Sequence, residues 1–136
     1  MRRRILVIDD NTAFRGALAQ ALETERFTVV AEAATGASGV QLAREHEPDL
    51  VIVDVQLPDT DGFDVAEQLA ALELPMEVIL TSGLHLSDLG TLVAESSARG
   101  FIPKAELSAG AIKALLGEGA ETSPFPMGDS GFGDNA

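Results

Sequence analysis

The sequence predicts an α/β domain built on a five-stranded parallel, doubly wound sheet. Five short apolar segments rich in β-branched residues alternate along the chain with segments of helical period. The apolar segments are continuous rather than alternating, which is typical of strands covered on both faces. With 136 residues, 46% of them hydrophobic and 23% charged, the chain has the length and composition of one globular domain.

The strands are expected at residues 5–8, 27–31, 50–53, 78–80 and 101–102. The first, third and fourth of these carry the strongest pattern, because charged or turn residues bound each apolar run. The segments 27–31 and 101–102 are weaker examples of the same pattern. Together they predict a sheet whose central strands are buried on both sides.

Helices are expected between the strands, at residues 11–25, 36–46, 63–72, 86–97 and 108–116. In the first, Phe14, Leu18 and Leu22 fall on one helical face, and Asn11 or Thr12 can cap its start. A serine caps the last one. Strand–helix alternation predicts right-handed crossovers, with helices on both faces of the sheet.

Composition excludes several functions. Nine Lys and Arg against 22 Asp and Glu give a net charge of −13, which argues against direct nucleic-acid or membrane-surface partners. There is no cysteine, so disulfides and thiol chemistry are excluded. The apolar run after the three N-terminal arginines is shorter than the roughly 7–15 residues of a secretory signal core, and no apolar stretch approaches the ~20 residues of a membrane span. A soluble, cytoplasmic protein is expected.

The composition changes near the C-terminus. Residues 1–117 are predicted to form the folded domain. Residues 118–136 are rich in Gly, Pro and Ser, with four acidic residues and no basic ones. This composition predicts a disordered tail.

Polar residues follow the predicted strands at the point where each one ends. Asp9 and Asp10 follow the first strand, Asp54 the third, Ser82 the fourth and Lys104 the fifth. In a doubly wound sheet the working site lies beyond the carboxyl ends of the strands. Each residue alone could be a turn, a cap or a surface charge, but their joint placement at one edge predicts a functional site.

The residue types at this edge suit magnesium and phosphoryl chemistry. Three converging carboxylates repel one another, and a hard divalent cation such as Mg²⁺ relieves that repulsion through oxygen ligands. No His or Cys accompanies the set, so zinc and copper fit poorly. A carboxylate can accept a phosphoryl group as an acyl phosphate, and Ser82 and Lys104 would then contact the phosphoryl oxygens.

The motifs "ILVIDD", "PDLVIVDVQLPDTDG", "VILTSG" and "GFIPK" resemble, in order and spacing, the receiver domain of bacterial response regulators. The resemblance covers about residues 4–116 and implies a flavodoxin-like (βα)₅ fold with strand order 2-1-3-4-5. The segment from "VVAEAATG" to "FDVAEQL" is closest in pattern to receivers that precede a helix-turn-helix output domain. No such domain fits in the tail, so a stand-alone receiver is expected.

The resemblance assigns the acceptor and the metal ligands. Asp54 would be the phosphoacceptor, Asp10 a direct Mg²⁺ ligand and Asp9 a ligand through water. The backbone carbonyl of Gln56 would complete the protein's share of the metal shell. Gly62 matches the close bend that follows the acceptor.

The resemblance also assigns a switch. Ser82 would be the switch hydroxyl, Lys104 the phosphoryl-binding cation and Phe101 the switch aromatic. The family usually has proline after the lysine, where this chain has Ala105, so the Lys104–Ala105 peptide could be cis or trans.

The resulting function is a phosphoacceptor in a two-component system or phosphorelay. The expected partners are a histidine kinase or histidine phosphotransfer protein, and a downstream protein of unknown identity. A second copy could also bind through residues 86–97, 100–103 and 108–116. The domain would not be an enzyme, although it would assist its own Mg²⁺-dependent phosphorylation and dephosphorylation.

Two alternatives remain open on the sequence. One is a receiver-like docking module that works without phosphorylation. The other is a small phosphohydrolase with an aspartyl nucleophile, of the haloacid dehalogenase type. That class has its nucleophile after the first strand in an Asp-x-Asp motif, whereas this chain reads Asp9-Asp10-Asn11 there.

Overall fold

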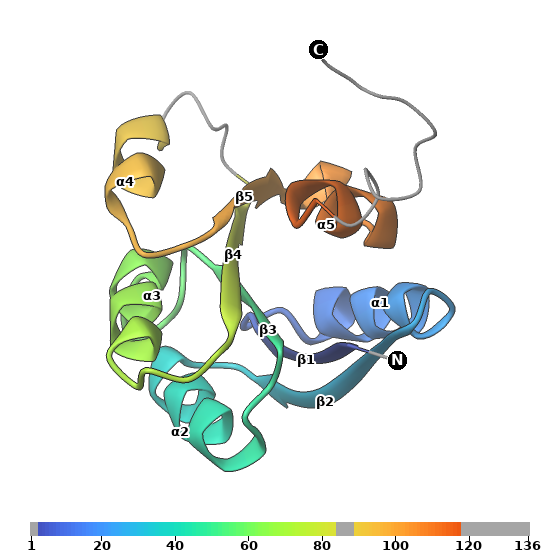
Figure 1. The fold of residues 1–136 in the computed structure, drawn as a ribbon, viewed down its shortest axis with the longest axis horizontal. Helices are drawn as coiled ribbons and strands as arrows, with labels where there is room; N and C mark the ends of the chain where they lie inside the picture. The colour runs from blue at the N-terminus through green and yellow to red at the C-terminus, as the bar shows by residue number, and fades with distance from the viewer. Residues whose placement is uncertain (1–2, 84–88, 118–136) are drawn as a thin grey trace, which may run out of the picture.

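The computed structural model describes residues 3–83 and 89–117. Its sheet has five parallel strands in the order β2-β1-β3-β4-β5, which confirms the predicted architecture (Figure 1). All five predicted strands are present, and each is longer than its apolar run. Their bounds are β1 (Arg3–Ile8), β2 (Phe27–Ala33), β3 (Leu50–Asp54), β4 (Glu77–Ser82) and β5 (Gly100–Pro103).

The helices α2, α3 and α4 cover one face of the sheet, and α1 and α5 cover the other (Figure 1). The side chain of Asn11, rather than that of Thr12, caps α1 by accepting from the backbone N–H of Phe14. Ser108 caps α5 as predicted, by accepting from the N–H of Ala111. The helix bounds are α1 (Thr12–Glu23), α2 (Gly36–His46), α3 (Gly62–Ala70), α4 (Gly90–Glu95) and α5 (Ala109–Leu115).

The predicted helix at residues 86–97 is too long. In the described part of the chain Leu89 lies in a turn, α4 begins at Gly90, and it ends at Glu95. Ser96 has an extended backbone, and its hydroxyl donates to the carbonyl of Val93. Such a local side-chain bond competes with the helical one and ends the helix. Residues 86–88 of the prediction lie outside the described residues, as does the predicted tail at 118–136.

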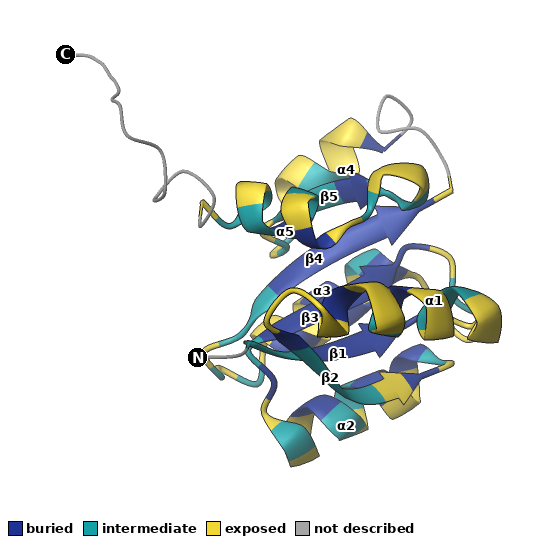
Figure 2. Ribbon diagram, turned by 90° about the vertical axis from the view of Figure 1, so that its right-hand side faces the viewer, coloured by how far each residue is buried: buried dark blue, intermediate teal, exposed yellow. Residues whose placement is uncertain are grey.

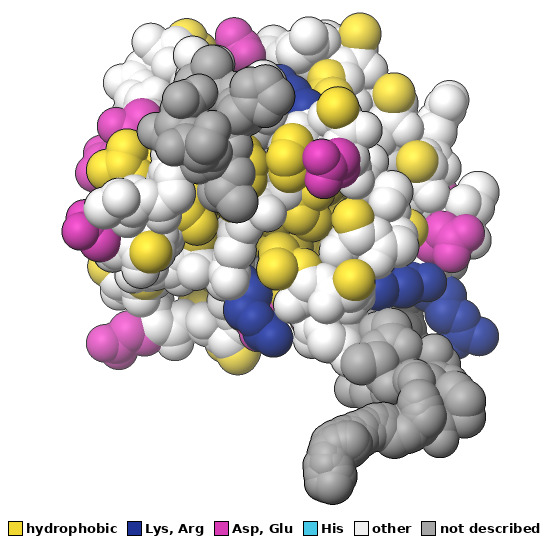
Figure 3. Space-filling view, turned by 90° about the horizontal axis from the view of Figure 1, so that it is seen from above, with side chains coloured by type: hydrophobic (Ala, Val, Ile, Leu, Met, Phe, Trp, Pro, Cys, Tyr) yellow, Lys and Arg dark blue, Asp and Glu magenta, His cyan; other side chains and the backbone are white. Residues whose placement is uncertain are grey.

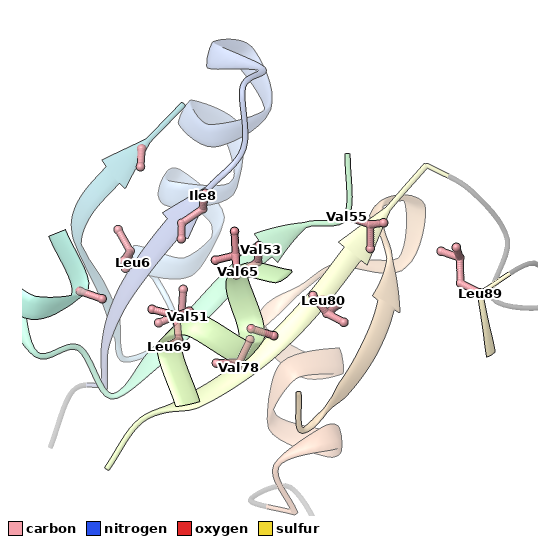
Figure 4. Close-up of a cluster of buried hydrophobic side chains, with 13 residues drawn as sticks. Leu6, Ile8, Val51, Val53, Val55, Val65, Leu69, Val78, Leu80 and Leu89 are labelled. Atoms are coloured by element: carbon pink, nitrogen blue, oxygen red, sulfur yellow. The ribbon is translucent and has the colours of Figure 1, made fainter. Parts of the chain in front are cut away.

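Two hydrophobic cores lie on opposite faces of the sheet because successive strand residues point to opposite sides. In β1, Leu6 and Ile8 join the core under α2 and α3, whereas Ile5 and Val7 join the core under α1 and α5. Figure 4 shows the first of these cores. Figure 2 shows buried strands between helices whose outer sides are exposed. The continuous apolar runs therefore reflect strands covered on both faces, as predicted.

Asp59 joins the loop between β3 and α3 to the start of α2. Its two carboxylate oxygens accept from the backbone N–H groups of Gly36 at 2.8 Å and Ala37 at 3.0 Å. A Cβ added at Gly36 would lie 2.5 Å from Cγ2 of Thr60, so helix and loop are in close contact. The loop that follows Asp54 is therefore held by a helix from elsewhere in the chain.

Among the described residues, no helix combines the length and the apolar character that a membrane crossing requires.

The Asp59 contact predicts a pH-dependent contribution to stability. The N–H groups of Gly36 and Ala37 lower the pKa of the Asp59 carboxyl below its ordinary 3.8. Its contribution is therefore complete above that pH and is lost as the pH falls through the lower folded-state value. We expect Asp59→Asn to lower the urea midpoint at pH 7, and the difference from wild type to shrink below about pH 4.

The matched control for this measurement is Glu45→Gln, which removes one charge from the other end of α2. A difference between Asp59→Asn and wild type that is unchanged down to pH 2 would contradict the assignment of the effect to the ionised carboxylate.

Candidate functional site

The strand order brings the predicted acidic residues together. Asp54 is the last residue of β3, and Asp9 directly follows β1, its neighbour in the sheet. One carboxylate oxygen from each of Asp9, Asp10 and Asp54 lies within 4.8 Å of the others. Asp9 and Asp54 are buried, whereas Asp10 is exposed to solvent. The structure thus places two of the three carboxylates where water does not stabilise their charge.

Lys104 lies between the two buried carboxylates. Its Nζ is 2.9 Å from Oδ2 of Asp9 and 3.0 Å from Oδ2 of Asp54. Lys104 follows β5, at the sheet edge, so its long side chain spans the ends of β4 and β3 to reach the residue after β1. One ammonium therefore offsets part of the charge of both carboxylates.

The surroundings shift two pKa values in the site. Burial raises the pKa of the Asp54 carboxyl, and the charge of Asp9 adds to this, while the N–H of Gln56 and the ammonium of Lys104 oppose it. Burial alone would lower the pKa of Lys104, but its contacts with Asp9 and Asp54 outweigh burial and raise it. Lys104 stays protonated, and the charged form of Asp54 remains poorly stabilised.

A divalent cation fits this donor set. Oδ2 of Asp9 is buried, and its partner among the described residues is Nζ of Lys104 at 2.9 Å. That oxygen can accept a further partner, because a carboxylate oxygen has two lone pairs. Its neighbours are oxygens of Asp10 and Asp54, which are the ligand type that Mg²⁺ prefers.

The turn after Asp54 holds the carboxylate in place. The N–H of Gln56 donates to Oδ1 of Asp54 at 3.0 Å, and the N–H of Gly62 donates to the carbonyl of Val55 at 2.8 Å. A Cβ at Gly62 would lie 2.5 Å from the carbonyl oxygen of Asp54 and 2.8 Å from Cα of Val55. Glycine is therefore needed there for close approach of two backbone segments.

The remaining predicted residues lie at the ends of β4 and β5. Ser82 is fully buried at the end of β4, and the hydroxyl of its neighbour Thr81 donates to the carbonyl of Ile102 at 2.7 Å. Phe101 is half-buried and packs against the core on the α4 side of the sheet. The described residues contain no cis peptide, so the Lys104–Ala105 bond is trans.

Sequence reasoning missed the contribution of α1 to the site. The ring of Phe14 lies 4.7 Å from Nζ of Lys104, in cation–π range. Arg15 donates to the backbone carbonyl of Asp9 and pairs with Glu32 at 3.0 Å, and the N–H of Asn11 donates to Oδ1 of Asp9 at 2.8 Å. The signal was available, because the first turn of a helix that begins directly after Asp9 and Asp10 must lie beside them.

Comparisons with known proteins agree with this geometry. The family model for the response regulator receiver domain matches residues 5–116. The chain is 34% identical to the transcription regulator BvgA of Bordetella pertussis, with 100% of this chain and 66% of that protein covered. It is 32% identical to the chemotaxis protein CheY of Bacillus subtilis, with 76% of this chain and 87% of that protein covered.

A solved receiver-domain structure is similar to this chain in both fold and sequence. The receiver domain of the response regulator NarL from Mycobacterium tuberculosis superimposes with a TM-score of 0.78 at 31% identity, covering 90% of this chain and 98% of that one. The chain spans less than two thirds of the length of several curated relatives, including 39% of the transcriptional regulator PdtaR of Mycobacterium tuberculosis.

The close approach at Gly62 predicts that adding a methyl group there lowers the stability of the fold. Gly62→Ala should lower the free energy of unfolding by about 1–3 kcal/mol, because backbone atoms on the facing segment cannot rotate away. Chemical denaturation measures this. Gly16→Ala makes the same chemical change on the exposed side of α1, where nothing lies within 4 Å, and it should stabilise by up to about 1 kcal/mol. Equal effects in the two variants would contradict the close packing at Gly62.

Proposed function

Because this chain belongs to the family of response regulator receiver domains, we propose that it accepts a phosphoryl group on Asp54 from a histidine kinase or histidine phosphotransfer protein. The observation that carries the proposal is the position of Asp54, which is buried and held by the N–H of Gln56 and by Lys104 beside a second buried carboxylate. Its relatives are signalling proteins, and the role proposed is that of a phosphoacceptor rather than of an enzyme acting on a separate substrate.

The chemistry follows from the groups around Asp54. A carboxylate oxygen of Asp54 attacks the phosphorus of the donor phosphohistidine, and the P–N bond breaks with its electron pair going to the imidazole nitrogen. The product is an acyl phosphate on Asp54. The ammonium of Lys104, already 3.0 Å from Asp54, would attract the phosphoryl oxygens. The hydroxyl of Ser82 would donate a hydrogen bond to one of them.

Mg²⁺ is the cofactor in this proposal. Asp9, Asp10, Asp54 and the backbone carbonyl of Gln56 would hold it. The convergence of three carboxylates, with the ammonium of Lys104 between two of them, supports such a role. When bound, the ion offsets the charge of the phosphoryl oxygens. The domain would then assist both its own phosphorylation and the later hydrolysis of the acyl phosphate.

The output is proposed to be a change in protein–protein contact. A phosphoryl group adds about −1.5 to −2 charges at Asp54. Movement of Ser82 toward it would leave space for Phe101 to turn inward, which couples a local charge to a two-state packing change. The affected face is formed by α4, β5 and α5, and Figure 3 looks onto this side and shows hydrophobic side chains at its surface. A downstream protein or a second copy of the chain would bind there.

The proposed receiver unit spans residues 1–117, with residues 118–136 as a separate tail. The end of α5 supports this boundary, because Leu116 caps the helix and Gly117 follows with a φ of +82°. A glycine with positive φ directly after the last turn is a common end of a helix.

The first experiment tests the acceptor and the metal. Asp54→Asn should abolish labelling by acetyl phosphate, because an amide oxygen is too weak a nucleophile. Asp10→Asn should retain the fold and require about tenfold or more Mg²⁺ for the same labelling rate, since it removes one charged ligand. Phosphate incorporation measured across a Mg²⁺ series tests both, with circular dichroism to check folding. Labelling of Asp54→Asn at the wild-type rate would show that the acceptor lies elsewhere.

The second experiment tests the switch. Amide shifts in NMR spectra with and without a beryllofluoride mimic and Mg²⁺ should change along α4, β5 and α5 as well as beside Asp54. Phe101→Ala should remove much of the change along that face while leaving the change beside Asp54. Shifts confined to the loops around Asp9, Asp54 and Lys104 would refute the switch without refuting phosphorylation.

A further inference from the structure

A groove with a volume of about 400 Å³ runs between α3 and α4. Phe63 of α3 and Leu92 of α4 supply its apolar surface. Leu92 is 51% exposed and is the large hydrophobic side chain that the described part of the chain leaves most open to solvent. An exposed leucine by itself is ordinary; here it lies beside an aromatic ring in a shallow, open groove.

Four carboxylates surround these two apolar side chains: Asp61, Asp64, Glu67 and Glu95. In residues 3–83 and 89–117, none of the four has a cationic partner within 4 Å, although several exposed carboxylates elsewhere do. Some of these carboxylates accept hydrogen bonds from uncharged groups of the protein. Asp61 caps α3, and Glu67 accepts from the backbone and hydroxyl of Ser97 at 2.7 Å. These bonds fix the carboxylates in position and leave their negative charge uncompensated.

The charge of the groove argues against two occupants that the chain itself could provide. Residues 118–136 carry Phe and Met side chains, but they also carry four acidic residues and no basic ones. A second copy of the chain brings a net charge of −13. Both would meet like charge at the rim, which disfavours docking.

We propose that the α3–α4 groove is a docking site for a basic protein segment that inserts one large apolar side chain between Phe63 and Leu92. Lys or Arg residues flanking that side chain would pair with Asp61, Asp64 and Glu95, which lie around the groove. The apolar contact supplies most of the affinity, whereas the charges supply orientation and a faster encounter. An amphipathic helix or an extended segment with this pattern fits equally, since both can present one anchor between two cations.

This site shares α4 with the face formed by α4, β5 and α5, but its other half comes from α3. The groove is present in the unmodified chain, so docking is proposed without phosphorylation of Asp54. The inference goes beyond the proposed function and is tested on the unphosphorylated full-length protein, so its failure would leave the assignment of Asp54 untouched.

The experiment selects ligands without assuming their sequence. A phage-displayed library of short random peptides is panned against the immobilised protein, and the enriched peptides are synthesised and titrated into labelled protein by NMR. We expect enriched sequences with a Leu, Phe or Trp next to two or more Lys or Arg, and amide shifts along Gly62–Ala70 and Gly90–Glu95. Raising the salt concentration should weaken binding.

Three variants make the result specific. Leu92→Ala and Glu95→Lys should each raise the dissociation constant about tenfold, because one removes apolar contact and the other reverses a rim charge. Glu45→Lys makes the same charge change on α2 and should leave binding within about twofold of wild type. All three sites are solvent-exposed, so the fold should be retained.

Three outcomes would overturn the proposal. They are a failure to enrich any basic, apolar-anchored sequence, shifts that map to another face, and equal weakening by Glu45→Lys and Glu95→Lys. The last would mean that net charge alone attracts the peptide.

Discussion

One ammonium held between two buried carboxylates is the contact around which the functional end of the molecule is arranged. Lys104 contacts Asp9 and Asp54 at 2.9 and 3.0 Å, and Asp10 adds a third negative charge at the edge of the same cluster. A single positive charge cannot offset three negative ones, and burial raises the pKa of Asp54 in spite of it. Under the proposed function, a divalent cation would offset this excess negative charge.

Parallel strand order makes this contact possible. β1 and β3 are neighbours, so the residues at their carboxyl ends are neighbours too, and a lysine after the edge strand is long enough to reach both. Residues at the start of α1 also contact this site. Phe14 covers the lysine, and Arg15 and Asn11 bind the backbone and the side chain of Asp9. Each of these contacts restricts the charged groups without neutralising the excess negative charge.

The loop from Asp54 to Gly62 connects this chemistry to the rest of the fold. Its start is fixed by the N–H of Gln56 on Asp54, its middle by Asp59 on the first turn of α2, and its end by the close approach of Gly62 to the Asp54 backbone. Asp61 then caps α3 at the rim of the groove that α3 shares with α4. Asp54 and the proposed docking groove therefore lie at the two ends of one short, firmly held segment.

The sequence alone determined the alternation of strands and helices, the cap at Ser108, and the position of the carboxylates, hydroxyl and lysine at the strand ends. It left the cap of α1 open between Asn11 and Thr12, and the structure shows that Asn11 provides it. These features are local. A continuous apolar run indicates a strand buried on both faces, and apolar residues at helical period indicate a helix buried on one side. Periodicity does not determine strand order, which was expected from family resemblance and is set by packing.

Only the tertiary structure decided which groups touch. It showed that Lys104 reaches both Asp9 and Asp54 and that α1 contributes Phe14 and Arg15. It also brought acidic residues of α3 and α4, far apart in sequence, to one groove without a described cation nearby. Such contacts join residues on different elements, so they depend on how the helices pack on the sheet and leave no periodic trace in the chain.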